Sequence, residues 1–173
     1  MAHEVGLPAA DTRVTLPWRL AALVTVVFAV LLLRSAWMSD DAAISWRTVL
    51  NVTHGFGLTF NIAERVQTFT HPLWLLLLTG TYLIAGNLFV ATIALSMAVS
   101  LIAFWIAIRR AATVWQAALA AVVLVFSRAF VDFDVSGLEN PLFNLLIALF
   151  LWLFLAMSPS RVMVRRSLKL AAS

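Results

Sequence analysis

Long uninterrupted apolar runs constrain this chain more than any other feature of its sequence. Trp18–Met38, Leu88–Ile108 and Ala112–Phe130 each approach the roughly 20 apolar residues that a helix needs to cross a bilayer, and Pro141–Met157 is slightly shorter. Hydrophobic residues make up 63% of the chain and charged residues 12%, whereas soluble domains are nearer half apolar and a quarter charged. The runs predict an all-α, polytopic membrane protein with about four transmembrane helices.

The two ends of the chain and its basic residues predict the topology. Residues 1–17 contain acids and prolines, and no convincing small-residue cleavage site follows the first run, so we expect a retained anchor rather than a cleaved signal peptide. Basic residues gather at Arg109–Arg110 and in residues 158–173, and such residues favour the cytoplasmic side. We therefore expect a transmembrane domain over residues 18–157 between two cytoplasmic tails.

A fifth apolar stretch, Pro72–Ala85, is ambiguous because at about 14 residues it is short for a span. If it lies on the outer surface, Arg109–Arg110 falls inside and Ser136–Asn140 outside. If it crosses, the arginine pair and one polar loop lie on the wrong sides. We expect an interfacial or re-entrant helix over residues 72–86, following an outer loop at 39–72, with a second outer loop at 131–140.

The composition also excludes several kinds of site. The chain has no cysteine, so disulfides and thiolate metal sites are ruled out. The formal net charge is +4, but the basic residues flank apolar runs and do not alternate with aromatic residues, so we expect no nucleic-acid partner. Membrane lipid is the partner that the apolar surfaces predict.

The two outer loops hold six of the eight acidic residues, and these are Asp40, Asp41, Glu64, Asp132, Asp134 and Glu139. Carboxylates at the mouth of a membrane are costly, so the pair Asp40–Asp41 directly after the first run is a functional-site hypothesis. For Asp132 and Asp134 an ordinary solvated loop is an equal alternative. We expect a site at the outer boundary between membrane and water.

Residues 40–54 have the pattern of an amphipathic helix. Asp40, Arg47, Asn51 and His54 fall on one side of a helical wheel, and Ala42, Trp46, Val49 and Thr53 fall opposite. Gly55 and Gly57 then interrupt the helix. An interfacial helix without chemistry remains the alternative, but carboxylates followed by an arginine and a histidine suit an anionic, lipid-linked substrate.

The loops also carry ordered motifs. The first contains Asp40-Asp41-Ala42, Ile44-Ser45, Arg47, Asn51, Gly55, Gly57, Asn61, Glu64-Arg65-Val66 and Pro72-Leu73-Trp74, and the second contains Ser136-Gly137-Leu138-Glu139-Asn140. Together they resemble C-type glycosyltransferases, which are multi-pass enzymes that use polyprenyl-phosphate sugars. The likeness is greatest to bacterial arabinofuranosyltransferase-like members. It covers residues 20–157, which correspond to the amino-terminal part of that fold.

The resemblance implies a mechanism at the outer face of a bacterial plasma (inner) membrane. Asp40 or Asp41 would act as the general base on an acceptor hydroxyl. Arg47, Asn51, His54, Arg65 and Glu139 would bind the substrate or its phosphate. A divalent cation, magnesium or manganese, held by Asp40 and Asp41 is the one cofactor that this chemistry admits. Donor and acceptor would be a polyprenyl-phosphate sugar and a cell-envelope glycan or lipid.

Alternatives to a chain that is catalytic by itself follow from the same residues. Since the resemblance covers only the first part of the family's fold, a second polypeptide could complete it. The chain could instead be a non-catalytic accessory or assembly protein, or a remnant, that retains this part. A small transporter is weaker, because the spans lack internal charges and broken-helix repeats.

Overall fold

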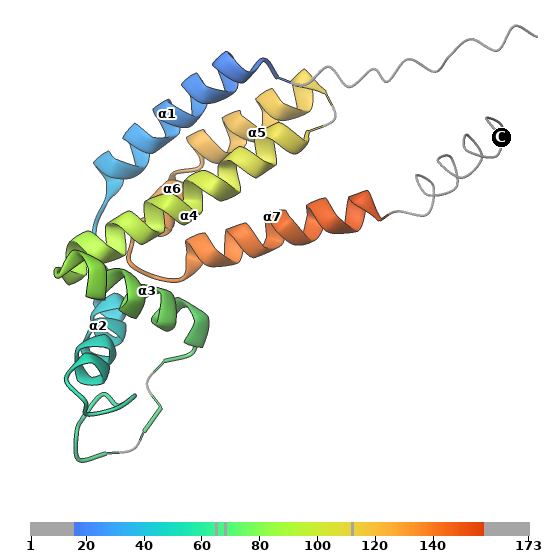
Figure 1. The fold of residues 1–173 in the computed structure, drawn as a ribbon. Coiled ribbons are helices and arrows are strands. Elements are labelled where there is room, and N and C mark those ends of the chain that lie inside the picture. Colours follow the sequence, from blue (N-terminus) through green and yellow to red (C-terminus); the bar gives the residue numbers. More distant parts are fainter. Residues whose placement is uncertain (1–15, 65, 68, 112, 158–173) are drawn as a thin grey trace, which may run out of the picture.

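The structure is a computed structural model that describes residues 16–64, 66–67, 69–111 and 113–157. Within these residues it is all-helical, as predicted, with seven α-helices and no strand (Figure 1). The helices are α1 (Trp18–Ser35), α2 (Asp40–Thr53), α3 (Pro72–Ala85), α4 (Leu88–Arg110), α5 (Val114–Phe126), α6 (Arg128–Asp134) and α7 (Asn140–Ala156).

Two of these helices, α1 and α4, are long and apolar enough to cross a membrane, and a third span is present if α5 and α6 are counted as one bent pair. The other apolar helices, α3 and α7, have 14 and 17 residues. Large apolar side chains cover the outside of the bundle, and Ile84, Trp115 and Phe126 are 80–90% exposed. Such a surface is compatible with a membrane protein, because lipid can cover it.

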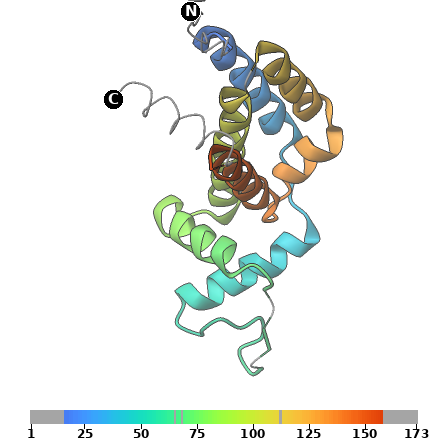
Figure 2. The same ribbon diagram turned by 90° about the vertical axis from the view of Figure 1, so that its right-hand side faces the viewer.

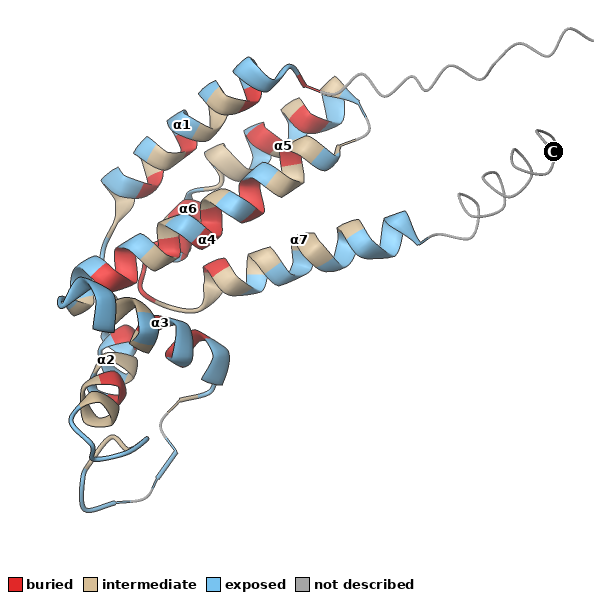
Figure 3. Ribbon diagram, in the orientation of Figure 1, coloured by how far each residue is buried: buried red, intermediate tan, exposed pale blue. Residues whose placement is uncertain are grey.

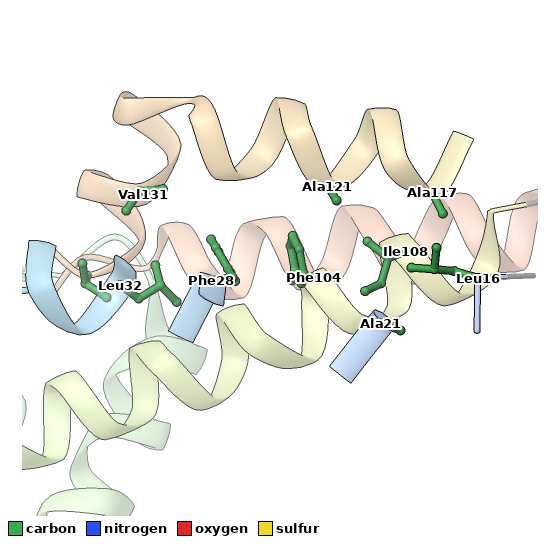
Figure 4. Close-up of a cluster of buried hydrophobic side chains, with 10 residues drawn as sticks. Leu16, Ala21, Phe28, Leu32, Phe104, Ile108, Ala117, Ala121 and Val131 are labelled. Carbon is green, nitrogen blue, oxygen red and sulfur yellow. The ribbon is translucent and has the colours of Figure 1, made fainter. Parts of the chain in front are cut away.

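Helix α4 is the centre of the fold and packs against α1, α3, α5 and α7 (Figure 1). The main core lies between α1, α4 and α5, where the rings of Phe28 and Phe104 stack with centroids 4.4 Å apart (Figure 4). Ala117 and Ala121 of α5 face the same core, and their small side chains let the helices approach closely. Buried residues also occur in α2, α3 and α6 and in the first turn of α7 (Figure 3).

Helices α2 and α3 lie side by side at one end of the bundle, beside the carboxyl end of α1 and the amino end of α4 (Figure 2). A second apolar cluster joins them to α4 through Val49, Leu75, Leu78 and Ala91. The bounds of α3 agree with the apolar stretch predicted at Pro72–Ala85. Gly86 ends this helix with a left-handed backbone, and the side chain of Asn87 caps the start of α4 by accepting a 3.1 Å hydrogen bond from the Val90 amide.

The bounds of α2, Asp40–Thr53, agree with the helix predicted over residues 40–54. Its apolar side is buried at Ala42 and Val49, whereas Asp40 and Arg47 are exposed. The two glycines that follow the helix have φ angles of 83° and 86°, a region that side chains with a Cβ rarely adopt. The predicted interruption at Gly55 and Gly57 therefore has a backbone cause.

The third apolar run, predicted as one span over Ala112–Phe130, is broken. Helix α5 ends at Phe126, and α6 leaves it at an angle of 70°. The break lies at Ser127, whose amide bonds to the Val123 carbonyl at 3.0 Å and whose hydroxyl accepts a 3.3 Å hydrogen bond from the Phe130 amide. Ser127 thus ends one helix and caps the next. The segment predicted as the start of an outer loop is helical as far as Asp134.

Candidate functional site

Two loop segments that are far apart in the sequence are bonded to each other through their backbones. The Ser39 amide donates to the Ser136 carbonyl at 2.9 Å, and the Trp37 amide donates to the Val135 carbonyl at 3.2 Å. The Trp37 indole adds a 3.0 Å hydrogen bond to the Asp132 carbonyl. The segment that leads into Asp40 and Asp41 is therefore joined to the segment that leads into Glu139.

Gly137 lies where these segments meet, and its position requires a glycine. Its φ angle is +88°, and a Cβ added there would lie 2.7 Å from the Ala42 Cβ and even closer to the sulfur of Met38. The Trp74 indole, which is 2% exposed, donates to the Gly137 carbonyl at 3.4 Å. The amino-terminal parts of α2 and α3 therefore converge on one turn before α7.

Asp40 and Asp41 are exposed in the first turn of α2. Ser39 caps this helix, its hydroxyl accepting a 3.2 Å hydrogen bond from the Ala42 amide. The two carboxylates thus lie beside the free amide groups at the start of the helix. No group of three or more histidine, aspartate or glutamate residues that could hold a metal ion occurs in the part of the chain that the structure describes.

Arg47 and Asn51 bind the loop that follows α2. Arg47 donates to the Asn61 side-chain oxygen at 3.1 Å, and its guanidinium lies 4.3 Å from the centroid of the Phe60 ring. Asn51 donates to the carbonyl oxygens of Thr59 and Phe60 at 2.7 and 3.0 Å. Both side chains hold the loop, and Arg47 remains exposed for contact with an anion.

The remaining predicted residues do not all gather at one point. His54 is exposed at the far end of α2, about 20 Å along the helix from Asp40, and its Nδ1 lies 2.7 Å from the Leu50 carbonyl oxygen. A single phosphate cannot contact both ends of this helix. Arg65, predicted to bind phosphate, lies outside the described residues.

Glu139 has a partner that the sequence did not indicate. Its Oε1 lies 2.6 Å from Nε2 of His71, the residue before α3, and the two side chains are 26% and 48% exposed. His71 is not among the site residues predicted from the sequence. Its position directly before Pro72, at the start of an apolar helix, was the available signal. The contact joins the starts of α3 and α7.

A shallow hollow of about 440 Å³ lies beside this region, in the loop that Arg47 and Asn51 hold. The Thr59 hydroxyl is buried and has no hydrogen-bond partner among the described residues. The residues that line the hollow are Phe56, Gly57, Leu58, Thr59, Val66, Gln67 and Phe69. Aromatic rings beside hydroxyl and amide groups can contact a sugar ring.

The chain was compared with family models, with curated proteins and with solved structures, and none of these comparisons found a match.

Proposed function

We propose that this chain forms the amino-terminal part of a membrane glycosyltransferase that takes a sugar from a polyprenyl phosphate at the outer face of a bacterial inner membrane. The observation that carries the proposal is the backbone pairing of Ser39 with Ser136. This pairing brings together the two segments whose motifs resemble those of C-type glycosyltransferases. An acceptor glycan or lipid of the cell envelope would approach from the aqueous side.

In this proposal Asp40 or Asp41 takes the proton of the acceptor hydroxyl. Both carboxylates are exposed and can come within hydrogen-bond distance of a substrate. Arg47 would meet the charge that develops on the leaving phosphate. Since His71 lies 2.6 Å from Glu139, we assign this pair to holding the starts of α3 and α7 together.

The number and direction of the membrane crossings are part of the same proposal. We propose four crossings, made by α1, α4, the α5–α6 pair and α7, with both termini cytoplasmic and α3 on the outer surface. The position of α3 beside the amphipathic α2 at one end of the bundle supports this arrangement (Figure 2). A divalent cation at Asp40 and Asp41 would need further ligands from substrate or water, because two carboxylates leave most of its coordination sites open.

The proposal is tested in a deletion strain complemented with the wild type, Asp40→Asn, Asp41→Asn or Asp132→Asn. Asp132 is the matched control, because it is a partly exposed acid whose side chain pairs with the exposed Arg128, at 3.3 Å. The measurement is the sugar composition of the cell-envelope glycan at equal membrane levels of protein. We expect Asp40→Asn or Asp41→Asn to lower sugar transfer at least about 100-fold, and Asp132→Asn to transfer sugar as the wild type does. Full transfer by both α2 variants would refute catalysis by this pair.

An accessory or assembly role is the second candidate, and the packing of α7 favours it. Pro141 is the only buried residue of this helix, while Phe143, Phe150 and Phe154 are each more than 60% exposed. Such a face suits a second polypeptide as well as lipid. This role predicts that substitutions on that face abolish the glycan phenotype while both α2 variants retain it.

A further inference from the structure

Asp134 is a buried acid for which the proposed transfer reaction has no use. It is the last residue of α6 and is 1% exposed. Its Oδ1 accepts a 2.7 Å hydrogen bond from the Asn144 side chain of α7. Its Oδ2 is buried and has no hydrogen-bond partner among the residues that the structure describes. The Ser100 hydroxyl of α4 is the other polar group at this carboxyl group, and it lies outside normal hydrogen-bond geometry.

Two more buried oxygens without a partner occur on the neighbouring face of α4. The hydroxyl of Ser100 faces the Asp134 carboxyl group, and Ser96 lies one helical turn before it on the same face. Both serines are at most 1% exposed, and neither hydroxyl makes a hydrogen bond of normal geometry in the described part of the chain. Unpartnered buried oxygens are rare in folded proteins and often mark a bound ion or water.

The burial of this cluster makes the missing charge partner more significant. Asp134 is 1% exposed, and both serines are at most 1% exposed. A carboxylate buried to this degree is strongly unfavourable unless a positive charge neutralises it.

No side chain supplies that charge among the described residues. Helices α5 and α7 contain no charged residue. The charged residues of α1, α4 and α6 itself either contact other groups or are exposed away from Asp134. Arg109 donates to the Leu16 carbonyl, and Arg110 lies over the Trp152 ring. The charged residues concerned are Arg19 and Arg34 of α1, Arg109 and Arg110 of α4, and Arg128 and Asp132 of α6.

We propose that Asp134, Ser100 and Ser96 form a binding site for one sodium ion inside the helical bundle. The ligands are a carboxylate oxygen and two hydroxyl oxygens, which are the hard donors that a hard cation prefers. A single acid with neutral neighbours balances one positive charge, so the cation is monovalent. Asn144 orients the carboxylate by holding Oδ1, and a bound ion would tie α4, α6 and α7 together.

The test uses the full chain purified in detergent at pH 8, with thermal unfolding followed in sodium chloride and in choline chloride of equal ionic strength. At a tenfold excess of sodium over its dissociation constant, we expect the unfolding midpoint of the wild type to rise by about 3–6 °C. Bound ²²Na⁺ should reach one ion per chain. Asp134→Asn should abolish both effects, and Asp132→Asn, two residues away, should leave both unchanged.

A second variant keeps the test decisive if Asp134→Asn does not fold. Ser100→Ala retains the carboxylate and suits a helix, and it should weaken sodium binding by at least about tenfold. A wild type that retains no ²²Na⁺ and unfolds at the same temperature in both salts would overturn the proposal. Stability that follows pH and ignores sodium would overturn it as well, because a proton would then be the neutralising cation.

Discussion

The Ser39 amide and the Ser136 carbonyl, 2.9 Å apart, join the start of α2 to the turn before α7. Because both groups belong to the backbone, the contact depends on the path of the chain rather than on either side chain. That path is fixed nearby by Gly137, which packs against Met38 and Ala42.

Replacing Gly137 with alanine should destabilise the protein strongly. An alanine would have to adopt a φ of +88° with its Cβ 2.7 Å from the Ala42 Cβ, and strain and overpacking together should cost about 3 kcal/mol. The free energy of unfolding in mixed micelles measures this cost. Gly80→Ala is the matched control, because Gly80 lies within α3 with open space around it, and it should leave stability unchanged or raise it by up to about 1 kcal/mol. Equal effects at both positions would contradict the packing at Gly137.

The contact between His71 and Glu139 should be weak but measurable. Both side chains are partly exposed, so a double-mutant cycle with His71→Ala and Glu139→Ala should give a coupling energy of about 0.5–1 kcal/mol. The cycle uses the same unfolding measurement. Since each single variant also disturbs a helix start, only the coupling reports on the contact, and a value of zero would mean that the two residues act independently.

Removing the donor and removing the acceptor of the hydrogen bond between α2 and α4 should lower stability by different amounts. The Trp46 indole donates to the Thr92 hydroxyl at 2.8 Å, and that hydroxyl itself donates to the Leu88 carbonyl. Trp46→Phe leaves the hydroxyl satisfied, so we expect a loss of about 1 kcal/mol. Thr92→Val leaves the indole N–H without its acceptor and should cost about 1–3 kcal/mol. The measurement compares the free energies of unfolding of the two variants. A larger loss for Trp46→Phe than for Thr92→Val would contradict this expectation.

Truncating the stacked core should cost far more than truncating the outer surface. Phe28 is fully buried and stacks on Phe104, so Phe28→Ala should lower the free energy of unfolding by about 3–5 kcal/mol. Leu23 lies on the same helix but is 60% exposed, and Leu23→Ala should change it by less than about 0.5 kcal/mol. Comparable losses would mean that a partner covers the outer face of α1.

The proposed topology predicts the labelling of single cysteines, which can be placed cleanly because the chain has none of its own. In intact cells, a membrane-impermeant maleimide should modify both Glu64→Cys and Ala85→Cys, because α3 is proposed to remain on the outer surface. Ala111→Cys, next to the arginine pair, should react only after the membrane is permeabilised. Labelling of Ala85→Cys only after permeabilisation would mean that α3 crosses the membrane.

Much of the local structure could be predicted from the sequence. The bounds of α3 follow from Pro72 and Gly86, which favour the start and the end of a helix. The end of α2 follows from Gly55 and Gly57 for the same kind of reason. These signals act over a few residues, so no knowledge of distant contacts is required.

The break at Ser127 was missed because hydropathy averages over a long window and one serine barely changes the average. The hydroxyl of Ser127 caps α6 only because the chain turns there. The burial of Asp134, which the sequence places in an outer loop with a solvated position as an equal alternative, was missed for a related reason. Its burial depends on α4 and α7, whose positions relative to α6 are not encoded near Asp134 in the sequence.

The sequence by itself determined that the chain is helical and apolar enough for a membrane, because helix formation and hydropathy depend on neighbouring residues. Only the tertiary structure decided that Ser39 meets Ser136, that His71 meets Glu139, and that Asp134 is enclosed with Ser100. The physical reason lies in the helices themselves. Apart from the amphipathic α2, they are apolar on nearly all sides, so hydrophobicity does not select which faces pack. Close packing of small residues together with a few interhelical hydrogen bonds makes that choice.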